Sequence, residues 1–222
     1  MTNNSQLAVP PVNANTEAAK NSTQKRDVYL TGFGKFGDIL ENPTTSLAKK
    51  LAEHPKVTES HVLEVSKTGS AEVLKKLHAR AEERGRLCIL LHFGVSANSR
   101  TLKLEQVGYN VADFRVPDER GYVAKDEIIR EGEPDKIYTN VPLDDLQKML
   151  QPICSHISIS TDPGRYICNY VYFRSLVWII HRKAMGFPEP LALFVHVPKF
   201  SCMSFEDQVA VASKIVDIVA EM

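Results

Sequence analysis

The stretch LCILLHF, residues 87–93, decides the fold class of this chain. It is a short apolar run without alternation between apolar and polar residues, which is typical of a strand that is buried on both faces. Such a strand belongs to a sheet that helices cover from above and below. The sequence on either side of this run therefore has to supply the covering helices and the neighbouring strands.

Short β-like runs and amphipathic helical patterns alternate along the chain on both sides of residues 87–93. This order predicts an α/β protein, a three-layer α/β/α sandwich whose largely parallel, twisted sheet carries helices on both faces. Strands are expected at 27–31, 61–65, 87–93, 156–160 and 191–196, β-like pieces at 107–114 and 127–130, and helices at 43–54, 70–84, 143–150, after 168 and from 205. Because ligands bind where the strands of such sheets end, chemistry is expected just after residues 31, 93, 160 and 195.

Two helix starts are marked by capping residues. Asn42 precedes Pro43, which gives a side-chain cap followed by proline at the first helical position. Ser204 and Asp207 have the spacing of a capping box, so the last helix is expected to begin at residue 205.

The charge of the 222 residues is balanced, with 27 Lys and Arg against 27 Asp and Glu. No field of the whole chain attracts nucleic acid or an anionic membrane, so neither is expected as a partner. No apolar run approaches the roughly 18 to 20 residues that span a bilayer, and the first residues do not form a signal segment. A cytoplasmic protein is therefore expected, with oligomeric state left open between monomer and homo-oligomer.

Four cysteines, at 88, 154, 168 and 202, are far apart and form no C-x-x-C pair. This spacing argues against a metal site and against a disulfide-stapled scaffold. Reduced thiols are expected, and any one of them could be a nucleophile.

Residues 1–26 are rich in Asn, Ser, Thr, Ala and Pro and show no apolar period. A segment of this composition cannot offset the entropy lost on ordering, so a flexible extension is expected there. Residues 27–222 are expected to form a single domain.

The glycine-rich stretch TGFGKFG, residues 31–37, has Gly32, Gly34 and Gly37 at the spacing of a dinucleotide-binding loop. In such a loop the glycines lead directly into a helix whose N-terminus binds the pyrophosphate. Here the helix is expected only from Pro43, and Glu41 puts negative charge before it. A dinucleotide-binding oxidoreductase is therefore the alternative function, not the favoured one.

The same stretch carries two aromatic residues, Phe33 and Phe36. Large apolar side chains most often close the end of a core. They can also form the walls of a small apolar pocket that has backbone polar groups at its rim. Composition leaves both interpretations open.

Cys168 follows the chain break at Pro163–Gly164 and precedes a helical pattern, so it is expected at or near a helix N-terminus. The helix dipole stabilises a thiolate at that position. The alternative is a buried structural cysteine, since free cysteine is among the most buried residue types.

His196 ends an apolar run at the predicted carboxyl edge of the sheet and is the candidate base for the thiol. His92 lies near another strand end and is the rival imidazole. A Cys–His pair commonly needs a third group that fixes the imidazole tautomer, and Glu105 is the candidate. The alternative for Glu105 is an exposed carboxylate paired with Arg100 or Lys103.

Four dispersed motifs between residues 27 and 200 resemble the pyroglutamyl-peptidase I family of cysteine peptidases. They are TGFGKFG with Asn42-Pro43, Glu105 to Asn110 followed by RVPD at 115–118, YICN at 166–169, and FVHVP at 194–198. The chain departs from many family members at residues 94–100, GVSANSR, which have one residue more before the arginine than the family's glycine-rich segment.

This resemblance implies a peptidase that removes an N-terminal pyroglutamyl residue from peptides without metal or organic cofactor. It implies Cys168 as nucleophile, His196 as general base and acid, and Glu105 as the group that orients the imidazole. The expected substrate-binding residues, which match family motifs, are Phe33, Phe36, Asn42, Arg115, Val116 and Ile167. A binding protein that kept the pocket and lost catalysis is a third possibility.

Overall fold

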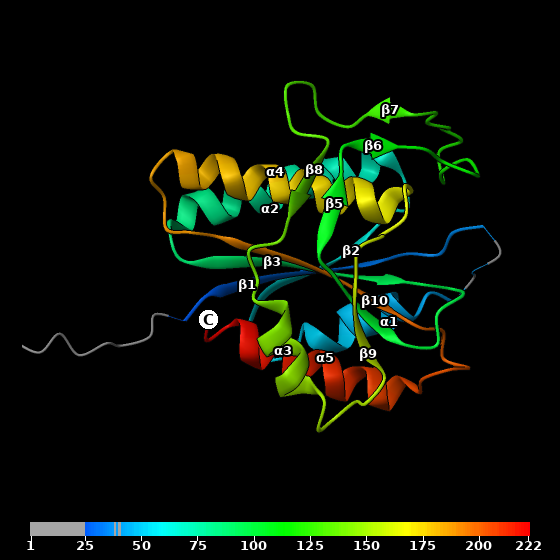
Figure 1. The fold of residues 1–222 in the computed structure, drawn as a ribbon, viewed down its shortest axis with the longest axis vertical. Helices are drawn as coiled ribbons and strands as arrows, with labels where there is room; N and C mark the ends of the chain where they lie inside the picture. The colour runs from blue at the N-terminus through cyan, green and yellow to red at the C-terminus, as the bar shows by residue number, and fades with distance from the viewer. Residues whose placement is uncertain (1–24, 38, 40) are drawn as a thin grey trace, which may run out of the picture.

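The computed structural model describes residues 25–37, 39 and 41–222. The strands of its main sheet are β1 (Asp27–Phe33), β2 (Val57–Leu63), β3 (Cys88–Val95), β4 (Leu102–Glu105), β9 (Ile157–Ser160) and β10 (Leu191–Val197). The helices are α1 (Pro43–Leu51), α2 (Lys67–Arg84), α3 (Leu143–Leu150), α4 (Ile167–Ala184) and α5 (Phe205–Val219). The six strands are arranged in the order β2-β1-β3-β10-β4-β9 (Figure 1).

The run at 87–93 forms β3, which lies inside the sheet between β1 and β10. Leu91 pairs with Leu30 on one side and with Leu193 on the other, both in parallel register. All residues of β3 except the last are buried. The continuous apolar run is therefore explained by burial on both faces, as predicted.

Strands β1, β2, β3 and β10 run in one direction, whereas β4 pairs antiparallel with β10, and β9 runs parallel to β4. The predicted three-layer, largely parallel fold is confirmed. Strand β4 was not predicted, because its four residues, LKLE, stand out little from the irregular stretch around them. Since β9 runs away from the edge where β10 ends, the expectation of chemistry directly after residue 160 does not hold.

Helices cover both faces of the sheet, with α2 and α4 on one side and α1, α3 and α5 on the other (Figure 1). Alternate residues of β1 and β3 divide between two cores. Leu30 and Leu91 face the core beneath α1, α3 and α5, whereas Tyr29 and Leu90 face the core beneath α2 and α4. The alternation of side chains along these strands thus assigns each residue to one of the two helical layers.

Both predicted capping residues are observed. The Asn42 side chain accepts from the Thr44 N–H, and the Ser204 hydroxyl accepts from the Asp207 N–H. Helix α2 starts at residue 67 instead of the predicted 70, because Ser66 caps it by accepting from the Gly69 N–H at 3.0 Å. Ser66 is a residue type that commonly caps helices, so the predicted start at residue 70 was wrong although the sequence contains the cap.

Two small antiparallel pairs pack against α4: β5 (Val107–Tyr109) with β8 (Lys136–Tyr138), and β6 (Val111–Ala112) with β7 (Glu127–Ile128). Asn169, in the first turn of α4, ties this segment down. Its amide accepts from the Tyr109 N–H at 2.8 Å and donates to the Tyr109 and Val111 carbonyls. The segment that follows β4 is therefore fixed to the helix start.

The first 24 residues of the predicted 1–26 extension lie outside the described residues. Arg26 is ordered against the rest of the chain: its N–H donates to the Ala220 carbonyl at 2.9 Å and its guanidinium to the Glu189 carbonyl at 2.7 Å. Among the helices that the structure describes, none combines the length and the apolar character that crossing a membrane would take.

Candidate active site

Cys168 lies in the first turn of α4, which confirms its predicted place at a helix N-terminus. No side chain caps this helix at Tyr166, so the N–H groups of the first turn are left to other partners. The Cys168 side chain is half-buried. Helix dipole and N–H groups together favour negative charge here, on the sulfur or on an oxygen bound beside it.

His196 lies at the end of β10 and is buried. Its Nδ1 is 2.7 Å from Oε1 of Glu105, which is 91 residues away in the chain. The other ring nitrogen is left free of Glu105, and Cys168 lies close enough to the imidazole to raise its pKa. The structure thus brings the three predicted side chains together, with the imidazole between the sulfur and the carboxylate.

The pKa of His196 reflects opposing effects. Burial lowers the pKa, but the hydrogen bonds to Cys168 and Glu105, together with the negative charge of both partners, raise it to about 9. The imidazole is therefore protonated at neutral pH and faces a sulfur at a helix N-terminus. A protonated imidazole beside a thiol at a helix N-terminus is the arrangement that a cysteine nucleophile requires.

Glu105 is completely buried on β4, opposite Phe194 of β10. The alternative of an exposed carboxylate paired with Arg100 or Lys103 does not hold. Its Oε2 has no hydrogen-bond partner among the described residues, and His196 is the only one of these residues that forms an ion pair with Glu105. The negative charge of this buried carboxylate therefore acts mainly on the imidazole and stabilises its protonated form.

His92 is not a base for the thiol. Its ring is fully buried, with Nδ1 2.8 Å from the Thr31 hydroxyl and Nε2 2.9 Å from the Ser175 hydroxyl. Burial lowers the pKa of His92 to about 3, so the ring stays neutral at physiological pH. Both ring nitrogens are occupied, and the rival imidazole is a structural residue.

The glycine loop packs on the start of α1 and leaves that helix end no role in phosphate binding. A Cβ at Gly32 would lie 2.1 Å from the Thr44 carbonyl oxygen, so glycine permits the close approach of β1 and α1. The Thr44 hydroxyl accepts from the Phe33 N–H at 2.9 Å, and Asn42 donates to the Gly34 carbonyl at 2.8 Å. Protein groups thus occupy the helix N-terminus.

The two loop phenylalanines differ in burial. Phe33 is only 2 % exposed, and its ring centre is 6.2 Å from that of Phe194, which lies two residues before His196 on β10. Phe36 is half-buried, with its ring centre 6.1 Å from that of Tyr166, which precedes the first turn of α4. Phe33 therefore closes the core, and Phe36 lies in the surface layer near the thiol.

The other predicted substrate residues lie around the same helix end. Asn42 is buried and holds the glycine loop, and Ile167 is fully buried. Arg115 is exposed, as is Val116 at 53 %, and Arg115 makes no ion pair with any described residue. The Tyr166 hydroxyl donates to the Pro117 carbonyl at 3.1 Å, which ties residues 115–117 to the start of α4.

Comparison with known families and structures identifies the chain. Residues 26–221 match a family model described as pyroglutamyl peptidase, which spans nearly all of the chain. The chain belongs to the pyroglutamyl peptidase family. The family resemblance of the four sequence motifs is thereby confirmed.

Relatives of this family member come from archaea and bacteria. The pyrrolidone-carboxylate peptidase of Pyrococcus furiosus is 32% identical over 175 residues, which cover 77% of this chain and 80% of the relative. That of Lactobacillus johnsonii is 29% identical over 173 residues, 77% of each chain. The solved pyrrolidone carboxyl peptidase of Thermococcus litoralis has a TM-score of 0.76 at 27% identity, covering 88% of this chain and 93% of the other. None of these findings supports the alternative of an oxidoreductase.

Gly94 is a site residue that the sequence reasoning missed. A Cβ at this position would lie 2.7 Å from Cζ of Phe194 and 3.1 Å from the Cys168 sulfur. Phe194 in turn contacts the His196 ring, with 4.8 Å between the ring centres. The available signal was a glycine inside a strand pattern, which often marks a close backbone approach.

The cysteines of this pyroglutamyl peptidase family member are all unpaired. Within residues 25–37, 39 and 41–222, no group of three or more His, Cys, Asp or Glu side chains is arranged to hold a metal ion. The arrangement around Cys168 offers a nucleophile, a proton donor and backbone N–H groups, which are the components of acyl transfer by a thiol.

Proposed function

We propose that this chain is a cysteine omega peptidase that hydrolyses the bond after an N-terminal pyroglutamyl residue of peptides. The observation that carries the proposal is the grouping of Cys168, His196 and Glu105, with Nδ1 of His196 2.7 Å from Glu105, in a chain of the pyroglutamyl peptidase family. Cys168 is the nucleophile, His196 the general acid and base, and Glu105 the residue that positions the imidazole.

In the first step, the Cys168 thiolate attacks the carbonyl carbon between pyroglutamate and the next residue. The carbonyl oxygen becomes an oxyanion, which the free N–H groups at the start of α4, that of Cys168 included, stabilise. These donors belong to the backbone of a regular helix, so they need no rearrangement when the charge develops.

In the second step, the tetrahedral intermediate collapses to a thioester as the carbon–nitrogen bond breaks. The His196 imidazolium gives its proton to the leaving amine. The neutral imidazole then takes a proton from water, whose oxygen attacks the thioester and releases free pyroglutamate and the thiolate. The Glu105 carboxylate holds Nδ1 at 2.7 Å throughout, so that the other nitrogen stays directed at the reacting atoms.

Recognition follows from the chemistry of the substrate. The lactam ring of pyroglutamate is flat and uncharged, so it requires apolar walls with a donor and an acceptor at its edge. Phe36 and Phe33 supply the walls in this proposal. The half-burial of Phe36 supports a surface role for it, whereas Phe33 acts from the core side.

The remaining substrate residues support or border this pocket. Asn42 holds the glycine loop by its bond to the Gly34 carbonyl, and Ile167 anchors the first turn of α4 in the core. Arg115 and Val116 border the site from the segment tied to Tyr166. The partners are thus peptides with an N-terminal pyroglutamate; nucleic acid and membranes are not involved, no cofactor takes part, and unpaired cysteines are consistent with the cytoplasm.

The decisive experiment compares arylamide substrates. The purified protein should release arylamine from pyroglutamyl-arylamide and not from glutamyl- or glutaminyl-arylamide, whose free ammonium does not fit an uncharged pocket. Cleavage also excludes a binding protein that has lost catalysis. Failure to cleave the pyroglutamyl substrate, or saturable binding of nicotinamide dinucleotides in a calorimetric titration, would refute the proposal.

The pH dependence tests the role of Glu105. The protonated form of His196 exists below its pKa of about 9, so hydrolysis should fall as the pH rises through that value. In a Glu105→Gln variant the carboxylate charge that raises this pKa is gone, so the alkaline fall should begin at lower pH. By analogy with other catalytic triads, kcat should drop by about 100-fold or more.

The control for this pH experiment is Glu83→Gln, which removes the same charge from an exposed position of α2. Its pH–rate profile should coincide with that of the unmodified protein. A Glu105→Gln variant that kept the position of the alkaline limb would show that Glu105 does not act through the imidazole.

A further inference from the structure

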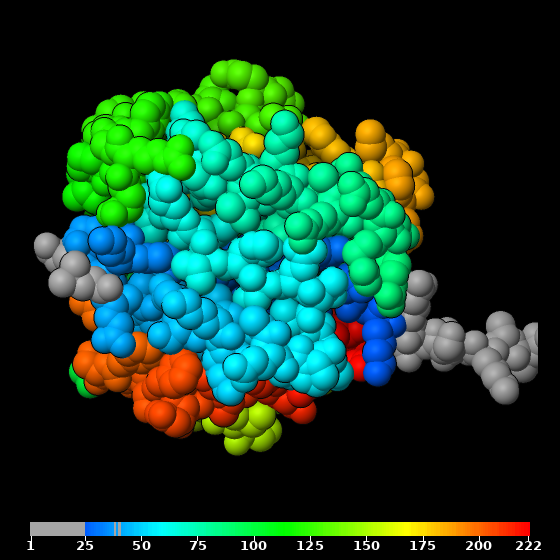
Figure 2. Space-filling model, turned by 180° about the vertical axis from the view of Figure 1, so that it is seen from behind, coloured from blue at the N-terminus to red at the C-terminus, as the bar shows by residue number. Residues whose placement is uncertain are grey.

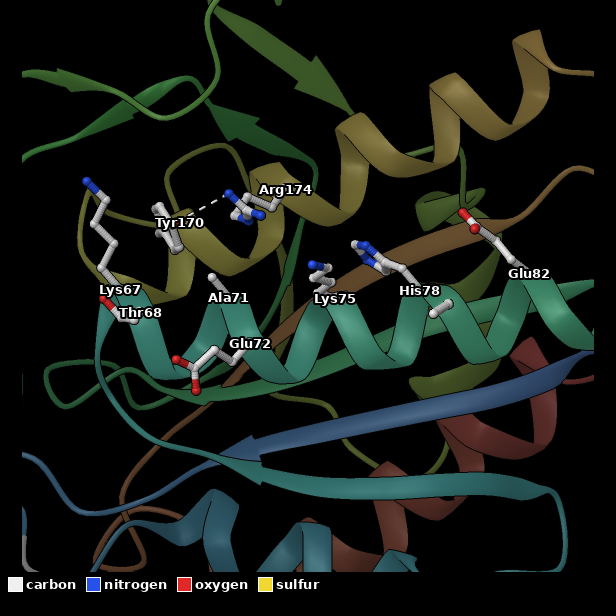
Figure 3. A pocket seen from close by; sticks show the side chains of 10 residues that line it. Lys67, Thr68, Ala71, Glu72, Lys75, His78, Glu82, Tyr170 and Arg174 are labelled. Carbon is white, nitrogen blue, oxygen red and sulfur yellow. Dashed lines mark hydrogen bonds between the residues drawn. The ribbon is translucent and has the colours of Figure 1, made fainter.

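A cleft of about 600 Å³ lies between α2 and α4, on the outer side of the helical layer and apart from the Cys168–His196 pair (Figure 3). The residues of α2 that line it extend from Lys67 to Glu82, nearly the full length of that helix. Tyr170 and Arg174 line it from α4. In the view from behind, α2 extends across the surface of the molecule, and part of α4 shows in the recess beside it (Figure 2).

Two buried nitrogen atoms in this cleft have no partner among the described residues. They are Nε2 of His78, from α2, and Nε of Arg174, from α4. Figure 3 shows both side chains in the space between the two helices. A buried polar group without a partner costs free energy, so two of them in one cleft indicate that a ligand supplies the missing acceptor.

Two cations of the cleft lack an acidic partner among the described residues, although two carboxylates also line the cleft. Its two carboxylates are engaged elsewhere: Glu82 accepts from the Trp178 indole at 3.0 Å, and Glu72 lies 3.9 Å from Arg120. Lys75 and Arg174 have no carboxylate within salt-bridge distance among the described residues. The positive charges of Lys75 and Arg174 therefore lie beside the two unpartnered nitrogens, one of which belongs to Arg174 itself.

A second, smaller cavity of about 140 Å³ is lined in part by the same two side chains. His78 and Arg174 line both cavities, and Arg130 adds a further cation to the smaller one. Arg130 makes no ion pair within the part of the chain that the structure describes, whereas His181, in the same cavity, lies 2.8 Å from Glu133. Positive charge thus continues from one cavity into the next.

We propose that the cleft between α2 and α4 is an anion-binding site that takes a small molecule carrying a carboxylate or phosphate group, held by Arg174, His78 and Lys75. The guanidinium and the imidazole donate to the oxygens of the anion, and the ammonium supplies charge from the rim. The aliphatic stems of the lysines, together with Ala71 and Tyr170, line the rest of the cleft and accept the apolar part of the ligand.

The protonation of His78 is compatible with this role. Burial, with smaller effects from His92 and Arg174, lowers the pKa of His78 to about 3, so the ring is neutral at pH 7. A neutral imidazole still carries one N–H and can donate it to an anion. The ring also stacks on Trp178, with 4.7 Å between the centres, which positions it against α4.

Trp178 makes the proposal directly testable, because it is the only tryptophan of the chain and contacts His78. Tryptophan fluorescence of the full-length protein is followed at pH 7 during titration with sodium phosphate and, separately, with sodium succinate. Sodium chloride keeps the ionic strength constant and serves as the blank. A saturable change with either anion is expected, and the anion that produces it identifies the preferred group.

The variants assign the binding to the cleft. Arg174→Gln should weaken it roughly tenfold or more, and Lys75→Gln should weaken it several-fold, since both remove a charge from the anion. If the glutamine variant does not fold, Arg174→Lys replaces it. This variant keeps the positive charge but loses the planar guanidinium with its several N–H donors, so it should also bind the anion more weakly. Lys49→Gln, which removes an exposed lysine from α1, should bind as the unmodified protein does.

A response that never saturates, or affinities unchanged in the Arg174 and Lys75 variants, would overturn the anion site. The peptidase proposal is judged separately, because the anion site uses none of its residues. A Cys168→Ser variant should therefore bind the anion with unchanged affinity, and loss of binding in that variant would also contradict a separate site.

Discussion

Hydrolysis of a pyroglutamyl-arylamide by a Cys168→Ser variant is expected to fall by at least about 10⁴-fold in kcat/KM. Serine nearly preserves the shape of the side chain, but a hydroxyl at this position does not exist as the anion that attacks the carbonyl carbon. His196 is protonated at neutral pH in the unmodified protein, and an imidazolium cannot take the proton from a serine hydroxyl. The loss is measured from the rate of arylamine release at saturating and at limiting substrate concentrations.

The matched control is Cys202→Ser, because Cys202 is an unpaired and exposed cysteine away from the site. Its activity should equal that of the unmodified protein. Both variants should unfold at the same temperature as the parent, which separates loss of chemistry from loss of fold. Undiminished turnover by Cys168→Ser would eliminate the thiol mechanism.

Gly94→Ala is expected to lower kcat/KM by about 100-fold, since a misplacement on the order of 1 Å in a catalytic site costs that much. The new Cβ would lie 2.7 Å from Phe194 and 3.1 Å from the Cys168 sulfur, so at least one of them has to move. Moving Phe194 also disturbs the ring of His196, which it contacts. The loss should appear mainly in kcat, because the substrate-side aromatics are not displaced directly.

Gly108→Ala is a control with a comparable steric conflict elsewhere in the molecule. Its Cβ would lie 2.9 Å from Leu176 and 3.2 Å from the main chain of Phe173, which both lie in α4 beyond its first turn. Overpacking costs about 1–3 kcal/mol in either variant, so both should unfold at lower temperature. If Gly108→Ala lost as much activity as Gly94→Ala, or if Gly94→Ala stayed fully active, the proposed contact with the thiol would be refuted.

Local patterns in the sequence determined the layers of the fold. The apolar run at 87–93 indicated a strand buried on both sides, and the caps at Asn42 and Ser204 fixed two helix starts. These features depend on residues within one turn or one strand, so they can be recognised without knowledge of the rest of the chain. The place of Cys168 at a helix start is of the same kind.

Strand direction and side-chain partnership required the tertiary structure. The sequence favoured His196 over His92 only through its place before the turn at Val197–Pro198, since both residues lie near the ends of apolar runs. One ring lies fully buried between Thr31 and Ser175, and the other faces Cys168 and Glu105. The difference arises from which helix and strand pack against each ring.

The charge network of the site depends on β4. Four residues with little strand character insert antiparallel beside β10, and this register puts Glu105 opposite Phe194 and within 2.7 Å of His196. By itself, therefore, the sequence determined the α/β layers, the helix ends and the set of candidate residues. Only the tertiary structure decided which of them meet, because contacts across 91 residues of chain are set by strand order and register, which leave no periodic signal in the sequence.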